Sequence, residues 1–370
     1  MKNIPIKAFA FAIACLSVLA PTAAFAQYGG ASHYAYVETN DASLNQILVY
    51  KEGPGGALRE VDAVATGGAG NGGSLGQGAL TLAGNGHILF AVNNGSNTIS
   101  VFRITPQGLT LLQVVASGGY GPLSISENEG LVYVLNAGGT LNNITGFVWT
   151  REAGLIPIPS STKQLSAASP TPVQIGITPD ANQVVVTEKA TNLIDVFNLT
   201  WEGRPSSAVV NKSAAATPFG FAFDSLGDLL VSDANGGLTG GAEGSSYAIN
   251  PSGTLAARTA VAPAHQTSAC WATTDIEGRF LYLADAGSNA ITAFRINYLG
   301  GLSLINPNGL AAATSPHPVD MAPSKDNQYL YALSNVGGAI DEFVIGADGS
   351  LTPIGTVYGL PTTASGLVTN

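Results

Sequence analysis

Short apolar runs that end in an acid or an amide recur along most of the chain. The seven four-residue cores are Val37-Glu38-Thr39-Asn40, Val92-Asn93-Asn94-Gly95, Leu135-Asn136-Ala137-Gly138, Thr187-Glu188-Lys189-Ala190, Ser232-Asp233-Ala234-Asn235, Ala284-Asp285-Ala286-Gly287 and Ser334-Asn335-Val336-Gly337. They begin at residues 37, 92, 135, 187, 232, 284 and 334, so the spacing is 43 to 55 residues. The second position is Glu, Asn or Asp in every copy. A period of this length predicts a repeat protein.

The residues around each core follow one order of elements. An apolar run opens the unit, as in Pro122-Leu123-Ser124-Ile125, and a glycine turn follows, as in Glu129-Gly130. After the core come an alternating run such as Ile99-Ser100-Val101-Phe102 and a last run such as Leu109-Thr110-Leu111-Leu112. These patterns predict strands, and four strands at this period are typical of propeller blades. Amphipathic helix periodicity is absent, which disfavours helical repeats.

The two ends of the repeat predict how the ring closes. The seventh inner strand, Ser365 to Asn370, stops where its turn should begin, and the chain starts its first unit at the second strand, with His33-Tyr34-Ala35-Tyr36. We therefore expect an all-β, seven-bladed propeller of four-stranded antiparallel blades. One blade would pair strands from both termini, which removes exposed sheet edges.

The first 26 residues have the features of a signal peptide. Lys2 and Lys7 precede an apolar run over residues 8–20. Ala24-Phe25-Ala26 then supplies the small residues of a cleavage site. We expect residues 1–26 to be removed and residues 27–370 to form a single domain that is secreted or periplasmic. No later run approaches the roughly 20 apolar residues of a membrane helix, so we expect no membrane insertion.

The charge balance narrows the range of partners. The chain has 14 basic and 24 acidic side chains, for a net charge of −10. Nucleic acids and anionic membranes need clustered lysine and arginine, so both are disfavoured. After cleavage Cys270 is the one cysteine left, and a disulfide within the chain is therefore not expected. We expect the protein to be a monomer.

Three segments carry a resemblance to a known family. They are residues 89–104 (LFAVNNGSNTISVFRI), 184–197 (VVVTEKATNLIDVF) and 218–234 (PFGFAFDSLGDLLVSDA), together with Ala269-Cys270-Trp271. The chain resembles the lactonase-type seven-bladed propellers with Tyr-Val-Thr-Asn-type repeats, which include 6-phosphogluconolactonases and carboxymuconate-cyclising enzymes, and within them a secreted branch. This resemblance implies the propeller fold and a hydrolytic reaction on a lactone.

Binding sites of propellers usually open where the inner strands begin. A lactone hydrolase needs a base, donors for the developing oxyanion and a cation if its substrate is anionic. We expect Glu188 to be the base and His317 to be the second candidate for acid–base work, since imidazole titrates near neutral pH. The predicted substrate-binding residues are Lys163, Lys189, Gln174, Asn93, Asn136, Asp233 and His265.

A structural interpretation competes with the functional one for most of these positions. An acid or amide after a strand commonly bonds its own turn, so we expect the repeated column mainly to cap turns. Cys270, beside Trp271, is better explained as a small buried residue than as a nucleophile. No metal-ligand motif such as HExxH or paired CxxC occurs, so no metal or other cofactor is predicted.

The arginines disagree with the pattern that the resemblance implies. Catalytic relatives are thought to hold phosphate or carboxylate groups with arginines near the central opening. The arginines here are Arg59, Arg103, Arg151, Arg204, Arg258, Arg279 and Arg295. None is expected at the start of an inner strand, and lysine is a poorer bidentate partner for such anions. A neutral lactone or a glycan is therefore favoured over phosphogluconolactone or carboxymuconate.

Three functional hypotheses remain open at this point. The first is a metal-independent lactone hydrolase on the open face of the ring. The second is a non-catalytic propeller that recognises a glycan or an envelope protein. The third is a calcium-dependent lactonase with Glu188, Asp233 and asparagines as ligands, because hard cations prefer oxygen donors. The fold hosts all three.

Overall fold

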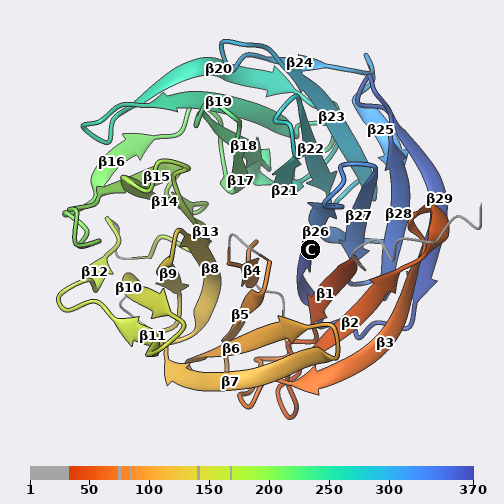
Figure 1. The fold of residues 1–370 in the computed structure, drawn as a ribbon. Coiled ribbons are helices and arrows are strands. Elements are labelled where there is room, and N and C mark those ends of the chain that lie inside the picture. Colours follow the sequence, from red (N-terminus) through yellow and green to blue (C-terminus); the bar gives the residue numbers. More distant parts are fainter. Residues whose placement is uncertain (1–32, 74–76, 84–85, 140–141, 167–168) are drawn as a thin grey trace, which may run out of the picture. The chain divides into compact units, whose positions relative to one another are not determined.

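The computed structural model describes residues 33–73, 77–83, 86–139, 142–166 and 169–370. These residues form seven antiparallel sheets that follow one another around a ring, with one strand of each sheet innermost (Figure 1). The predicted signal peptide lies outside the described residues. Among those described, no helix has the length and apolar character needed to cross a membrane.

Six blades are continuous in sequence and run from the inner strand outward. The first two consist of β4 (Leu80–Leu82), β5 (Ile88–Asn93), β6 (Thr98–Thr105) and β7 (Gly108–Ala116), and of β8 (Pro122–Asn128), β9 (Leu131–Asn136), β10 (Asn143–Thr150) and β11 (Gly154–Pro157), with β12 (Lys163–Gln164) paired to β10. The next two consist of β13 (Pro172–Ile177), β14 (Gln183–Glu188), β15 (Leu193–Asn198) and β16 (Val209–Lys212), and of β17 (Pro218–Phe223), β18 (Leu229–Asp233), β19 (Glu243–Ile249) and β20 (Leu255–Pro263). The last two consist of β21 (Ala269–Thr274), β22 (Phe280–Asp285), β23 (Ala290–Ile296) and β24 (Leu302–Leu304), with β25 (Leu310–Ala313) paired to β23, and of β26 (Pro318–Pro323), β27 (Tyr329–Ser334), β28 (Ala339–Ile345) and β29 (Leu351–Tyr358). Two short 3-10 turns, η1 (Pro54–Gly56) and η2 (Asn235–Gly237), interrupt the loops.

The remaining blade joins both ends of the chain. Its order is β30 (Ser365–Thr369), β1 (Tyr34–Glu38), β2 (Gln46–Glu52) and β3 (Leu58–Ala65). β30 pairs antiparallel with β1, with Tyr36 opposite Val368 and Val37 opposite Leu367. The predicted seven-bladed fold and its closure by terminal strands are therefore confirmed. The pairing supplies β1, a second strand, with its inner neighbour and completes the seventh four-stranded sheet.

Buried tyrosines on three of the second strands, Tyr133, Tyr282 and Tyr331, bind their blade to the next. The hydroxyl of Tyr133 donates to the carbonyl of Gly203 at 2.6 Å, and that of Tyr282 donates to Gly349 at 3.1 Å. The acceptors lie between the third and fourth strands of the following blade. A large apolar ring fills the space between blades, while its polar end still finds a partner, as buried tyrosines require.

Asparagines at the turns between second and third strands hold the entry to the next blade. Oδ1 of Asn97 accepts from the backbone N–H of Gly121 at 2.7 Å, and Oδ1 of Asn192 accepts from Thr217 at 2.7 Å. Oδ1 of Asn289 accepts from His317 at 2.9 Å. These contacts support the left-handed φ of Thr217 (58°) and His317 (63°), a conformation that is uncommon outside glycine.

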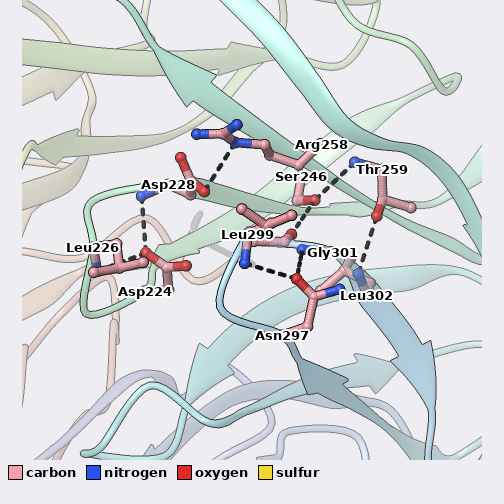
Figure 2. A network of polar contacts seen from close by, with 11 residues as sticks. Asp224, Leu226, Asp228, Ser246, Arg258, Thr259, Asn297, Leu299, Gly301 and Leu302 are labelled. Atoms are coloured by element: carbon pink, nitrogen blue, oxygen red, sulfur yellow. Dashed lines mark hydrogen bonds and ion pairs between the residues drawn. The ribbon is translucent and has the colours of Figure 1, made fainter.

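Polar contacts lie both within the blade of β17–β20 and between this blade and the next (Figure 2). Arg258 of β20 binds Asp228, with Nε 3.2 Å from Oδ2. The hydroxyl of Ser246 donates to the carbonyl of Gly300 at 2.6 Å, across from β19 to the turn that precedes β24. Arg258 therefore lies on the outermost strand of its blade, away from the inner strand, and is paired with an acid.

Candidate functional site

A pocket of about 360 Å³ lies where several inner strands begin. Its walls come from β8, β13, β17, β21 and the residue before β26. The lining residues are Leu123, Ala137, Thr171, Pro172, Val173, Lys189, Phe219, Cys270, Trp271 and His317. Lys189 and His317 are the two predicted site residues that the fold brings into this pocket.

The backbone before the inner strands positions the pocket residues. Thr171 (φ 45°), Thr217 and His317 adopt left-handed conformations directly before Pro172, Pro218 and Pro318. Each of these residues accepts a backbone hydrogen bond from the end of the second strand, as in Asn335 N–H to the His317 carbonyl at 3.2 Å. Strained residues persist only where their surroundings hold them, and they often mark functional sites.

Lys189 brings a positive charge onto an aromatic wall. Its Nζ lies 4.6 Å from the centre of the Phe219 ring, within range of a cation–π contact. The Phe219 ring lies 5.3 Å from that of Trp271, at an interplanar angle of 47°. Together they form an apolar floor with an ammonium group above it. A group that carries partial negative charge could bind beside Lys189.

His317 is held by the last member of the repeated column. Its Nδ1 lies 3.0 Å from Oδ1 of Asn335. Because an amide oxygen can only accept, this contact requires the proton on Nδ1. The other ring nitrogen, Nε2, then carries a lone pair and can accept a proton. The imidazole is half-buried at the pocket wall, so its tautomer and its position are both set.

Glu188, the first candidate for the base, is fully buried and does not line the pocket. Its carboxyl accepts from Thr191 Oγ1 at 2.7 Å and from Ser166 Oγ at 3.3 Å. Burial, with a contribution from the nearby Asp195 carboxyl, raises the pKa of Glu188 to about 7. The pKa of Asp195 is also raised by burial. The two acids form a pair that can share one proton.

Asn93, Asp233 and Asp285 of the column bond to the third strand of their own blade. Asn93 Nδ2 donates to Ser100 Oγ at 2.7 Å, and Asp285 Oδ2 accepts from Thr292 Oγ1 at 2.7 Å. Asp233 Oδ2 accepts from Ser245 Oγ at 2.7 Å. These acids and amides are fully buried. The expected turn-capping role is thus replaced by a side-chain bond between the second and third strands.

Two amides among the predicted substrate-binding residues, Gln174 and Asn136, are engaged elsewhere. Both polar atoms of the Gln174 amide bind the backbone of Phe221: Nε2 donates to the carbonyl oxygen at 2.9 Å, and Oε1 accepts from the N–H at 2.6 Å. Asn136 Nδ2 lies 3.0 Å from Oδ1 of Asn143. Gln174 therefore ties two inner strands together, and neither residue lines the pocket.

Lys163 and His265 also lie outside the pocket. Lys163 is half-buried on β12, beside the third strand of its blade, and His265 is exposed in the loop before β21. Cys270 does line the pocket, but burial raises the pKa of its thiol to about 12. The thiol stays protonated at neutral pH, which disfavours a nucleophilic role.

Sequence reasoning missed Phe219 and Trp271 as pocket residues, and it missed Asp195 as the partner of Glu188. Trp271 is 5 % exposed, and its Nε1 has no hydrogen-bond partner within the described part of the chain. Phe219 and Trp271 each follow closely after the start of an inner strand, and that register position is a signal for pocket walls. Asp195 lies seven residues after Glu188, the same separation as Asn93 and Ser100.

The fold is a seven-bladed propeller. Residues 23–169 match the family model described as Lactonase, 7-bladed beta-propeller. The resemblance to lactonase-type propellers inferred from the sequence is confirmed at this level, and the secreted branch stays a prediction. A search of the curated proteins returns no match to the chain.

Solved structures share the fold at low sequence identity. A periplasmic gluconolactonase from Pseudomonas aeruginosa is 17% identical, with 90% of this chain and 98% of that chain covered and a TM-score of 0.71. A candidate 6-phosphogluconolactonase from Bacteroides fragilis is 18% identical over 92% and 98% of the two chains, with a TM-score of 0.68. A protein from Lactobacillus plantarum is 16% identical over 92% and 99%, with a TM-score of 0.73. At these identities the likeness concerns the fold alone.

Proposed function

We propose that the chain hydrolyses a lactone in this pocket, with His317 as the general base. The contact between His317 Nδ1 and Asn335 Oδ1 carries the proposal, because it leaves Nε2 ready to accept a proton at the pocket wall. An imidazole base works near neutral pH without a metal. Glu188 is a weaker candidate because its carboxyl is enclosed and already bonded.

The reaction needs one water molecule and no other co-reactant. His317 Nε2 takes a proton from water as the water oxygen bonds to the lactone carbonyl carbon. The carbonyl oxygen becomes an oxyanion, which the Lys189 ammonium group can stabilise in the partly apolar pocket. The bond from this carbon to the ring oxygen then breaks. The ring oxygen takes the proton back from the imidazolium, and a hydroxy acid leaves.

The pocket walls favour a neutral lactone over a phosphorylated one. Leu123, Val173, Phe219 and Trp271 supply apolar surface, and Lys189 is the one lysine or arginine among the lining residues. Three arginines elsewhere in the described structure pair with acids, namely Arg204, Arg258 and Arg279. A dianionic phosphate would lack the bidentate partners that it prefers. The Pseudomonas aeruginosa relative is a gluconolactonase, which supports the lactone class for this proposal.

We also propose that the protein is exported from the cytoplasm and is a monomer. The basic start, the apolar run and the Ala24-Phe25-Ala26 site support a secreted or periplasmic protein. Mass spectrometry of protein recovered from outside the cytoplasm should then give a chain that begins at Gln27. An intact N-terminus there would contradict it.

The experiment is a pH-stat screen of the purified protein against neutral and anionic lactones, with and without a chelator. The test variant is His317→Asn, because asparagine tolerates the left-handed φ of 63° but cannot act as the base. We expect turnover to fall about 100-fold or more. Thr217→Asn is the matched control, since Thr217 holds the same conformation before Pro218 and does not line the pocket.

The outcomes separate the hypotheses. Acid release that survives in Thr217→Asn and is lost in His317→Asn supports the hydrolase and its base. Undiminished release in His317→Asn would exclude His317 as the base. Release from no lactone would favour a binding propeller for a glycan or envelope protein, and loss of release with the chelator would favour the calcium-dependent reaction.

A further inference from the structure

A histidine and two carboxylates converge at the end of the ring opposite the pocket. His33 precedes β1, Glu52 ends β2, and Asp326 lies in the turn between β26 and β27 of the adjacent blade. One ligand atom from each residue lies within 4.8 Å of the other two. His317 comes before β26 and Asp326 comes after it, so the pocket and this cluster lie at opposite ends of one strand.

The two carboxylates of this cluster lack a permanently charged partner. Glu52 Oε1 lies 3.7 Å from Nδ1 of His33, which is too long for a hydrogen bond. In the described ranges of the chain, neither Glu52 nor Asp326 forms an ion pair with a lysine or an arginine. Like charges held this close repel each other. A divalent cation between them would compensate both charges.

In each carboxylate, one oxygen accepts hydrogen bonds from the protein and the other oxygen can bind a metal ion. The Tyr331 hydroxyl donates to Glu52 Oε2 at 3.1 Å. Asp326 Oδ1 accepts from Ser324 Oγ at 2.7 Å and from the Gln328 N–H at 3.1 Å. Glu52 Oε1 and Asp326 Oδ2 are therefore available to a metal. Bonds of this kind to the outer oxygens orient metal ligands and support affinity.

We propose that His33, Glu52 and Asp326 form a zinc site that fastens the terminal blade to its neighbour. One imidazole and two carboxylates suit zinc, whereas calcium and magnesium prefer oxygen ligands throughout. A water would complete the four-coordinate shell. The site bridges the β26–β27 turn and the β1–β2 hairpin. This hairpin belongs to the blade that the pairing of β1 with β30 closes. Zinc that binds only the folded chain stabilises it by mass action.

The test is a calorimetric titration of the protein, free of any histidine tag, with zinc chloride. We expect one zinc per chain and a higher melting temperature. His33→Gln and Asp326→Asn should each weaken binding at least about 10-fold, because each removes one ligand. Asp326→Asn retains an oxygen that can accept from Ser324 and Gln328. His265→Asn is the matched control; it removes an exposed imidazole elsewhere and should bind zinc as the parent does.

Three results would overturn the zinc site. They are the absence of saturable binding, unchanged affinity in both His33→Gln and Asp326→Asn, or calcium binding as tight as zinc binding. The lactonase proposal needs no metal, so turnover measured with a chelator reports on it separately. Loss of zinc should lower the melting temperature and leave turnover at 25 °C intact.

Discussion

Nδ1 of His317 lies 3.0 Å from the amide oxygen of Asn335. Asn335 is the second residue of the last repeat core, and His317 directly precedes the inner strand of the same blade, so the repeat itself builds the contact. His317 lines the pocket, and its contact with Asn335 leaves Nε2 without the ring proton. The relationship leads to the first prediction.

Asn335→Leu should lower kcat about 10- to 100-fold with little change in KM, because the imidazole loses the partner that sets its tautomer. Asn335→Asp should retain most of the turnover, since a carboxylate oxygen can accept from Nδ1–H as the amide oxygen does. Steady-state kinetics measure both variants. A kcat of Asn335→Leu equal to that of the parent would argue against the role of His317.

Glu188→Gln should leave turnover near that of the parent and make the protein more stable at pH 8. The folded chain retains a proton on Glu188 up to a pKa of about 7, against an ordinary 4.5. The folded state therefore binds more protons than the unfolded chain, and the free energy of unfolding falls as pH rises through this range. Glutamine removes this loss, which we expect to be about 1 to 2 kcal/mol above pH 7.

Urea unfolding at pH 5 and pH 8 measures this effect. The stability gain of Glu188→Gln should appear at pH 8 and shrink at pH 5, where the parent carboxyl is protonated in the folded chain. Loss of turnover in a folded Glu188→Gln protein would restore Glu188 as the base.

Asn289→Gly should reduce both stability and turnover, because Asn289 Oδ1 holds the backbone N–H of His317. Glycine accepts the left-handed φ of 53° at this position. We expect a loss of about 1 kcal/mol from the missing hydrogen bond. Asn97→Gly removes the equivalent bond to Gly121, outside the pocket, and is the matched control. Equal turnover losses in the two variants would show a general stability effect.

Lys189→Met should separate anionic from neutral lactones. Methionine can still pack on Phe219 but carries no charge. We expect KM for a carboxylated lactone to rise at least about 10-fold, because it loses its cationic partner. For a neutral lactone we expect kcat to fall a few-fold, since the ammonium group stabilises only the developing oxyanion. Equal effects on KM for both substrates would exclude Lys189 as an anion anchor.

The repeat determined the fold because propeller architecture is local. Each core, with its flanking turn and alternating strand, specifies one blade, and the incomplete first and last units require β1 and β30 to pair. The same register placed Glu188, Asn93 and Asp285 at equivalent positions, and all three are buried in the structure. Sequence spacing is sufficient for such features, because their partners lie within one hairpin.

Only the tertiary structure decided which polar groups meet the pocket. Glu188 turns toward Asp195 and Thr191, while Lys189, the next residue, reaches the Phe219 ring of another blade. Asn289 fixes His317 across a blade boundary, and Asp326 meets His33 from opposite parts of the chain. Period and composition determine each blade. The angle and distance between blades, which depend on how buried side chains pack, decide what lies between them.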